Sequence, residues 1–132
     1  MTNAKQWLGR ARSSDRELRA LRDARQETFE QLTRITQNYT GDGAQSTKDP
    51  HKLDRLVEFD SLISQRETEL IQTRLEVTQA IIRVPSGNQR AVLLSYYVAG
   101  KTLEEIAVEI GCSARNVQNR RKRGAFWLEK NY

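Results

Sequence analysis

The first third of the chain repeats apolar residues at the alternating four- and three-residue spacing of a heptad. The middle third does the same from about Pro50 to Arg83. Between the apolar positions lie Arg, Glu, Gln and Asp, so both segments are predicted to be long helices with one apolar stripe and one solvated face. The first stripe consists of Ala4, Trp7, Ala11, Leu18, Leu21, Leu32, Ile35 and Tyr39, interrupted by Ser14, Arg25 and Thr28; the second consists of Leu56, Ile63, Leu70, Val77 and Val84.

A break separates the two predicted helices at about residues 40–50. It contains Gly41-Asp42-Gly43 and ends at Asp49-Pro50, and both are typical of loops. Two helices of similar length joined by one loop favour an antiparallel, coiled-coil-like hairpin. Because the stripes are interrupted, the hairpin alone buries little apolar surface. We therefore predict that residues 1–84 form a helical arm for self-association or for binding another protein.

A second boundary follows at Val84-Pro85, where the proline disfavours helical conformation at the residue before it. A helix is predicted over about residues 89–99, and Gly100 is well placed to terminate it. The remaining residues continue as short helices. The sequence thus predicts an all-α chain with a second domain over residues 85–132, a compact unit of three helices.

Two helices in this domain have the caps and the spacing of a helix-turn-helix. Thr102-Leu103-Glu104-Glu105 is a capping box that starts the first helix. Ser113 caps the second helix, predicted over about residues 114–130. Gly111 lies between them and suits the positive φ of a tight turn. The expected core of the helix-turn-helix comprises Ile106, Ala107, Ile110, Gly111, Val117 and Leu128.

Positive charge is concentrated in the last predicted helix. Residues 86–132 hold eight of the 22 Lys and Arg residues but only four of the 17 Asp and Glu residues. Such asymmetry is typical of an element that binds a polyanion. In a helix-turn-helix the second helix enters the major groove, where Arg and Lys suit guanine and Asn and Gln suit adenine. With Val117 turned inward, the residues expected to read bases are Arg115, Gln118, Asn119 and Lys122, and those expected to contact phosphates are Thr102, Ser113, Arg120, Arg121 and Arg123.

A further pattern runs from about residue 88 to residue 130 and consists of Arg90, Val92, Leu93, Tyr96 or Tyr97, Gly100, Thr102, Glu105 to Ala107, Gly111, Ser113, Val117, Arg120, Arg123 and Leu128. This pattern resembles the region-four helix-turn-helix of bacterial sigma factors. That family reads the −35 promoter element and contacts the RNA polymerase flap, so the resemblance implies double-stranded DNA as a partner and RNA polymerase as a further one. Gly124 stands where the family often has Ala. The succession of a helical arm and this unit is similar to small ArpU-like transcription regulators of phages and prophages of Gram-positive bacteria.

Several other functions find little support in the residues. A single histidine, His51, and a single cysteine, Cys112, supply neither a metal site nor a nucleophile–base pair. We expect no enzymatic activity, no cofactor and no metal. No run approaches the roughly 18 apolar residues of a membrane span, so no membrane partner is expected. The expected location is the cytoplasm of a bacterial host cell, in association with the nucleoid.

The sequence leaves three functions open. The first is a sequence-specific transcription regulator whose arm dimerises or binds RNA polymerase. The second is a phage DNA-packaging protein of the small terminase kind, which also joins a helix-turn-helix to a helical oligomerisation region. The third is an adaptor that binds RNA polymerase without binding DNA. A dimer favours regulation, and a ring of about eight or more subunits favours packaging.

Overall fold

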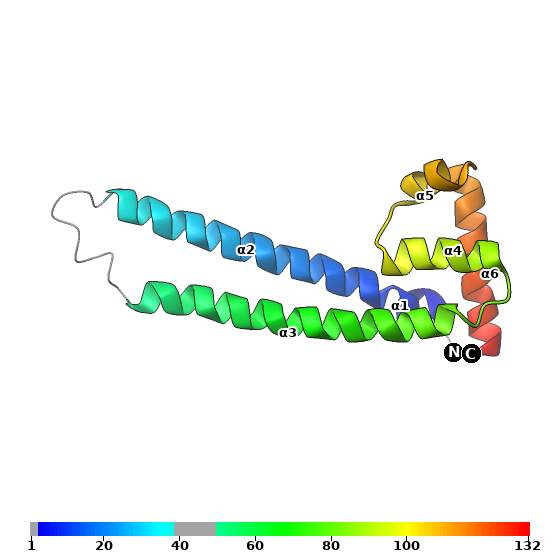
Figure 1. Ribbon diagram of the computed structural model, residues 1–132, viewed down its shortest axis with the longest axis horizontal. Helices are drawn as coiled ribbons and strands as arrows, with labels where there is room; N and C mark the ends of the chain where they lie inside the picture. Colours follow the sequence, from blue (N-terminus) through cyan, green and yellow to red (C-terminus); the bar gives the residue numbers. More distant parts are fainter. Residues whose placement is uncertain (1–2, 39–49) are drawn as a thin grey trace. The chain divides into compact units, whose positions relative to one another are not determined.

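A computed structural model describes residues 3–38 and 50–132, with side chains described for residues 3–35 and 53–132. The described residues are helical throughout apart from short connections, and they contain no strand, as the sequence predicts (Figure 1). Tyr39, residues 40–49 of the expected loop and the side chain of His51 lie outside this description. The elements in chain order are α1 (Ala4–Leu8), α2 (Arg10–Asn38), α3 (Pro50–Ile81), α4 (Gly87–Leu93), the π-helix η2 (Leu94–Val98), α5 (Leu103–Ile110) and α6 (Ala114–Asn131).

The first predicted helix is interrupted near its start. Asn3 caps α1 by accepting the N–H of Gln6 at 3.1 Å, and α1 ends at Gly9. Because glycine has the lowest helix propensity after proline, this is the weakest position of the segment. The heptad spacing of the neighbouring apolar residues gives no sign of the interruption.

Contacts divide the chain into two units. The compact unit consists of residues 1–15 and 69–132, and the paired-helix unit consists of residues 16–68. The last helical turns before residue 84 therefore pack with the domain predicted to begin at residue 85. The division of function between residues 1–84 and 85–132 stays a prediction.

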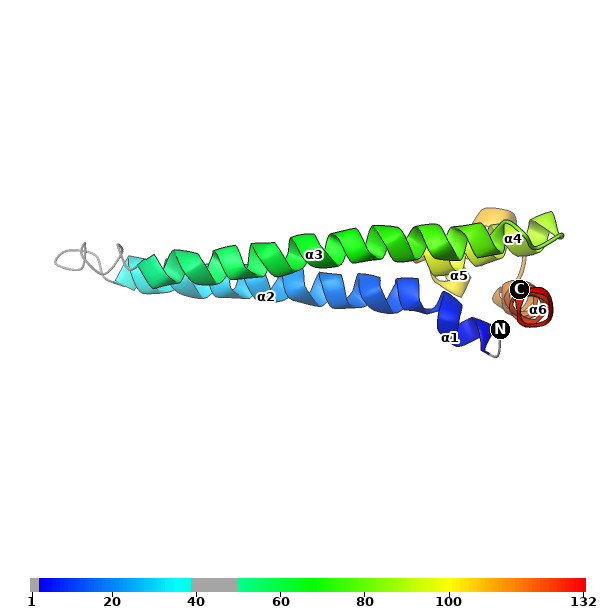
Figure 2. The same ribbon diagram turned by 90° about the horizontal axis from the view of Figure 1, so that it is seen from below.

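The compact unit is built around an apolar core to which α1, the start of α2, the end of α3, α4, η2 and α6 contribute. Figure 2 shows α1 beside α6, and the two helices are in contact. The connection from α3 to α4 is held by Arg90, whose Nη1 donates to the carbonyls of Val84 at 2.7 Å and Pro85 at 3.0 Å. The buried side chains of this core are Ala4, Leu8, Ala11, Val77, Ala80, Ile81, Val84, Leu93, Tyr97, Ala125 and Leu128.

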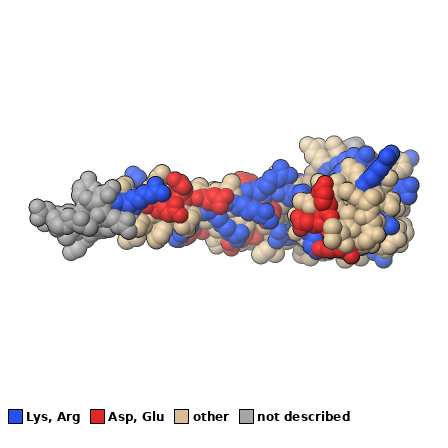
Figure 3. Space-filling view, turned by 90° about the horizontal axis from the view of Figure 1, so that it is seen from above, with Lys and Arg blue, Asp and Glu red and all other residues tan. Residues whose placement is uncertain are grey.

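The paired-helix unit joins the remaining parts of α2 and α3 as two antiparallel helices (Figure 1). Its apolar seam is narrow: Leu18 and Ile63 are buried, whereas Leu21, Leu32, Leu56 and Phe59 are only half-buried. In the space-filling view, basic and acidic side chains are interspersed along these helices (Figure 3). Ion pairs between the two helices include Arg22–Glu67, Arg25–Asp60 and Arg66–Glu17.

None of the helices in the described part of the chain is both long enough and apolar enough to span a lipid bilayer.

Candidate nucleic-acid interface

Caps fix the ends of the two helices that form the helix-turn-helix. The Thr102 hydroxyl accepts the Glu105 N–H at 3.2 Å and donates to the Glu105 carboxylate at 3.2 Å. Gly111 ends α5 with a φ of +72°, a left-handed conformation that glycine adopts without steric cost. The Ser113 hydroxyl then accepts the Asn116 N–H at 3.1 Å and starts α6. The turn between α5 and α6 is therefore formed by the residues that the sequence singles out.

A small apolar cluster holds α5 against α6 and α4. Val92, Ile106, Ala107 and Val117 are its buried members. Ile110, which the sequence places in this core, is instead 42% exposed in the last turn of α5, and Gly111, which the sequence also places there, is exposed in the turn that follows.

Leu128 is buried, but it belongs to the larger core with Leu93 and Tyr97. It lies eleven residues after Val117, which is about 16 Å along a helix. At that distance Leu128 cannot reach the α5–α6 contact. The helix-turn-helix core is therefore smaller than the sequence predicts, and the second half of α6 packs on other elements of the compact unit.

The outward face of α6 carries polar side chains with base-reading chemistry. At 100° per residue, Arg115, Asn119 and Lys122 lie opposite the buried Val117, and all three are exposed. Gln118, predicted to share this face, is half-buried at its edge, and its Oε1 accepts the Arg121 Nε–H at 2.9 Å. The structure thus brings three of the four expected base-reading residues together on one exposed face.

Arg121 lies on a different side of α6 from Arg120 and Arg123, which are also expected to bind phosphates. It follows Val117 by four residues, so its side chain leaves the helix within about 40° of the buried face. Its Nη1 donates to the Tyr97 hydroxyl at 2.9 Å, and its guanidinium lies 4.8 Å from the centre of the Tyr96 ring. The inward position of Arg121 could have been predicted from its helical angle relative to Val117. Its residue type alone does not distinguish it from Arg120 and Arg123.

Arg12 of α2 completes this cluster from the opposite end of the sequence. Its guanidinium lies 4.0 Å from the centre of the Tyr96 ring, and its Nη1 donates to the carbonyls of Tyr96 at 2.8 Å and Lys101 at 3.1 Å. Burial raises the pKa of the Tyr97 hydroxyl, and the charge of Arg121 opposes part of that rise. Arg12 and Arg121 therefore tie α2, η2 and α6 together behind the proposed DNA-reading face.

The remaining expected phosphate ligands are accessible to different extents. Arg123 is exposed and Arg120 is half-buried on α6. Thr102 and Ser113 are exposed at the N-termini of α5 and α6, where backbone N–H groups and the helix dipole favour an anion. Within the described part of the chain, no three His, Cys, Asp or Glu side chains come together as a metal site would require.

A comparison with protein families finds a match to part of the chain. Residues 74–125 match the family described as sigma-70, region 4. The match extends from the end of α3 to the middle of α6 and confirms the resemblance seen in the sequence. It identifies the segment as a DNA-binding helix-turn-helix of a transcription-related family, and that family is regulatory, not enzymatic.

Neither a curated protein nor a solved structure matches the chain.

Proposed function

We propose that this protein is a sequence-specific transcription regulator that reads the major groove of DNA with α6. The observation that carries the proposal is the exposed face of Arg115, Asn119 and Lys122 on the helix that follows the Gly111 turn. Each of these side chains can form paired hydrogen bonds with a base edge in the major groove. The match to sigma-70 region 4 supports a DNA-binding role for this segment.

The proposal includes RNA polymerase as a second partner and the cytoplasm of a bacterial cell as the location, in line with the family match. A phage or prophage origin rests on the ArpU-like succession of arm and helix-turn-helix seen in the sequence. DNA packaging and adaptor binding without DNA remain as alternative outcomes of the first experiment.

That experiment is binding of the full chain to fragments of bacterial genomic DNA at two salt concentrations, followed by sequencing of the recovered fragments. We expect enrichment of a few upstream regions that share a motif. Salt-sensitive binding without enrichment would favour packaging, because backbone contacts alone are independent of sequence. Absence of binding at both salt concentrations would leave the adaptor function.

Matched variants of α6 separate base reading from phosphate binding. Arg115→Ala and Asn119→Ala are expected to cost about 1–3 kcal/mol on the preferred site and to relax the preference at one base pair each. Arg123→Ala is expected to weaken binding to every sequence and to lower the salt dependence. Anisotropy titrations with the preferred site and its single-base variants measure both effects. Equal losses on every sequence from all three variants would contradict the assignment of the reading face.

We further propose that the arm self-associates. In the paired-helix unit, Leu53 and Val57 of α3 are exposed, and in the compact unit Ile71 and Leu75 of the same helix are exposed as well. Apolar side chains repeated along one helix favour burial against a partner helix. Light scattering over a range of concentrations is expected to show a dimer, and Ile71→Ser with Leu75→Ser is expected to shift it toward monomer. A monomer at every concentration would contradict this part of the proposal.

A further inference from the structure

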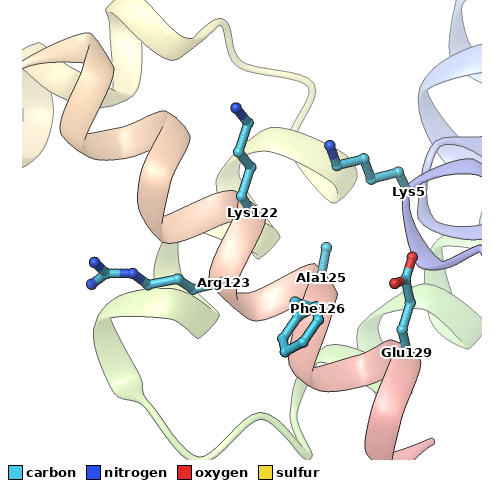
Figure 4. Close-up of a pocket in the computed structure, with 6 residues that line it drawn as sticks. All are labelled: Lys5, Lys122, Arg123, Ala125, Phe126 and Glu129. Carbon is cyan, nitrogen blue, oxygen red and sulfur yellow. The ribbon is translucent and has the colours of Figure 1, made fainter.

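A cleft of about 460 Å³ opens between α1 and α6, next to the reading face of α6 (Figure 4). One of its lining residues, Lys5, comes from α1 and lies outside the segment that matches the sigma-70 region 4 family. The others come from the middle and the second half of α6, where Phe126 and Glu129 also follow the matched segment. The complete lining is Lys5, Lys122, Arg123, Ala125, Phe126 and Glu129.

The charge of this cleft is predominantly positive. In Figure 4 the ammonium groups of Lys5 and Lys122 extend to the same side, away from the carboxylate of Glu129. Among the described residues, none forms an ion pair with Lys5, Lys122 or Arg123, whereas Glu129 Oε1 accepts the N–H of Ala4 at 3.1 Å. The three cationic side chains are therefore available to an anionic partner. The carboxylate of Glu129 already accepts a hydrogen bond from the first residue of α1.

The position of the cleft on α6 indicates which anion reaches it. Lys122 belongs both to the cleft and to the face that includes Arg115 and Asn119, so the two surfaces are continuous. When the first half of a recognition helix lies in the major groove, contacts beside it fall on the sugar-phosphate backbone. The exposed ring of Phe126 adds an apolar surface next to the cations.

We propose that Lys5 binds a phosphate of the DNA backbone at the edge of the major groove, beside the base-reading Lys122 and the phosphate-binding Arg123 of the proposed function. The inference rests on the proposed function, and it adds the N-terminal helix to the DNA-binding surface. A single ammonium that neutralises one phosphate changes the slope of log K against log salt concentration by about 0.9. It carries no base preference of its own.

The test is the salt dependence of binding by the full chain to a duplex of about 30 base pairs that contains an enriched genomic site. Lys5→Gln is compared with Lys5→Arg, which keeps the charge, and with Arg34→Gln, which removes the same charge from an exposed residue that does not line the cleft. We expect Lys5→Gln to lower the slope by about 0.9, so that the affinity lost between 50 and 200 mM salt shrinks about threefold. Lys5→Arg and Arg34→Gln keep the wild-type slope, and all variants keep the wild-type sequence preference.

A second substitution and a second probe keep the test decisive. Lys5→Glu reverses the charge and is expected to weaken binding at low salt more than Lys5→Gln does, with the same thermal unfolding midpoint, since Lys5 is exposed. If the wild-type protein shows no salt-dependent DNA binding, the proposed function fails, and this inference fails with it. If the wild type binds but Lys5→Gln keeps the slope of Arg34→Gln, this inference alone is overturned. An unchanged DNA slope with lost binding to polyglutamate would overturn it in favour of an acidic protein partner.

Discussion

The compact unit and the paired-helix unit share α2 and α3 but are held together by different means. In the compact unit, α1, α3, α4 and α6 share a core whose members are almost completely shielded from water. Among the described side chains of the paired-helix unit, only Leu18 and Ile63 are buried, and ion pairs such as Arg22–Glu67 at 2.8 Å join the helices along their exposed edges. Buried apolar side chains hold the compact unit together, whereas the paired-helix unit has far fewer of them among its described residues.

This difference determines where the free energy of unfolding comes from. Burial of a Leu or Val side chain contributes about 1.5–3 kcal/mol, whereas an exposed ion pair contributes about 0–1 kcal/mol. The compact unit therefore accounts for most of the stability, and the paired-helix unit opens at lower cost. A pair of helices that opens easily is suited to exchange its partner helix for one from another chain.

The largest effect is expected when a leucine in each unit is replaced by alanine. Leu8→Ala in the compact unit removes a side chain with no exposed surface and is expected to cost about 3 kcal/mol. Leu21→Ala in the paired-helix unit removes a half-buried side chain and is expected to cost about 1 kcal/mol. Denaturant titrations followed by circular dichroism measure both values. Equal losses would break the comparison.

A second test adds a methyl group to the core. A Cβ at Gly124 would lie 2.6 Å from Leu93 Cδ1, so Leu93 must move, and Gly124→Ala is expected to destabilise the compact unit by about 1–3 kcal/mol. Gly87→Ala is the matched control, because its Cβ meets only the end of the Arg90 side chain at 3.5 Å. The control is expected to be neutral or slightly stabilising. If Gly124→Ala proves as stable as Gly87→Ala, the packing of α6 on α4 is looser than described.

The third test concerns pH. Because burial raises the pKa of Tyr97, the folded state keeps its proton when the unfolded chain loses it, so the associated stability is present below the ordinary tyrosine pKa of about 10 and is lost as pH rises beyond it. Tyr97→Phe is expected to cost about 1–2 kcal/mol near pH 8 through the lost bond to Arg121, and to remove part of the decline between pH 9 and 11. Unfolding titrations at several pH values measure the slope. A slope that is the same in wild type and variant would contradict the burial of this hydroxyl.

The smallest expected effect lies in the paired-helix unit. Arg22→Gln removes an exposed interhelical ion pair and is expected to cost about 0.2–1 kcal/mol at low salt and almost nothing at 1 M salt. Arg34→Gln provides the control, since it removes an equal charge without an ion pair among the described residues. Hydrogen exchange of α2 amides resolves the change locally. Insensitivity to salt would show that the ion pairs do not contribute to this unit.

The fold was predictable where local signals are strong. Residue type alone predicts that helices begin after Thr102 and Ser113 and that one ends at Gly111. In the structure these residues are the N-caps of α5 and α6 and the C-cap of α5. The interruption at Gly9 was not predictable from spacing, because the apolar residues on both sides keep the heptad pattern. The π-helix over Leu94–Val98 also has no signature in the periodicity of so short a segment.

The sequence predicted which residues belong to the candidate site better than it predicted how their side chains are oriented and what they contact. Arg115, Asn119 and Lys122 follow from helical angles measured from Val117, and they are exposed. The orientation of Arg121 depends on the two tyrosines of η2, and the contribution of Arg12 depends on contacts between residues more than 80 positions apart. Long-range contacts of this kind are decided by tertiary packing, which a local pattern does not contain.

Residues 16–68 leave the compact unit along α2 and return to it along α3, so they form an insertion within a discontinuous domain. An insertion made of two paired helices can be shortened without altering the compact unit, provided that equal numbers of residues are removed from both helices. Deleting one heptad from each removes about 10 Å of helix and keeps every side chain on its original face. Chains that differ in the length of this insertion can therefore keep the proposed DNA-binding surface unchanged, which makes the length of the insertion an independent variable for protein engineering.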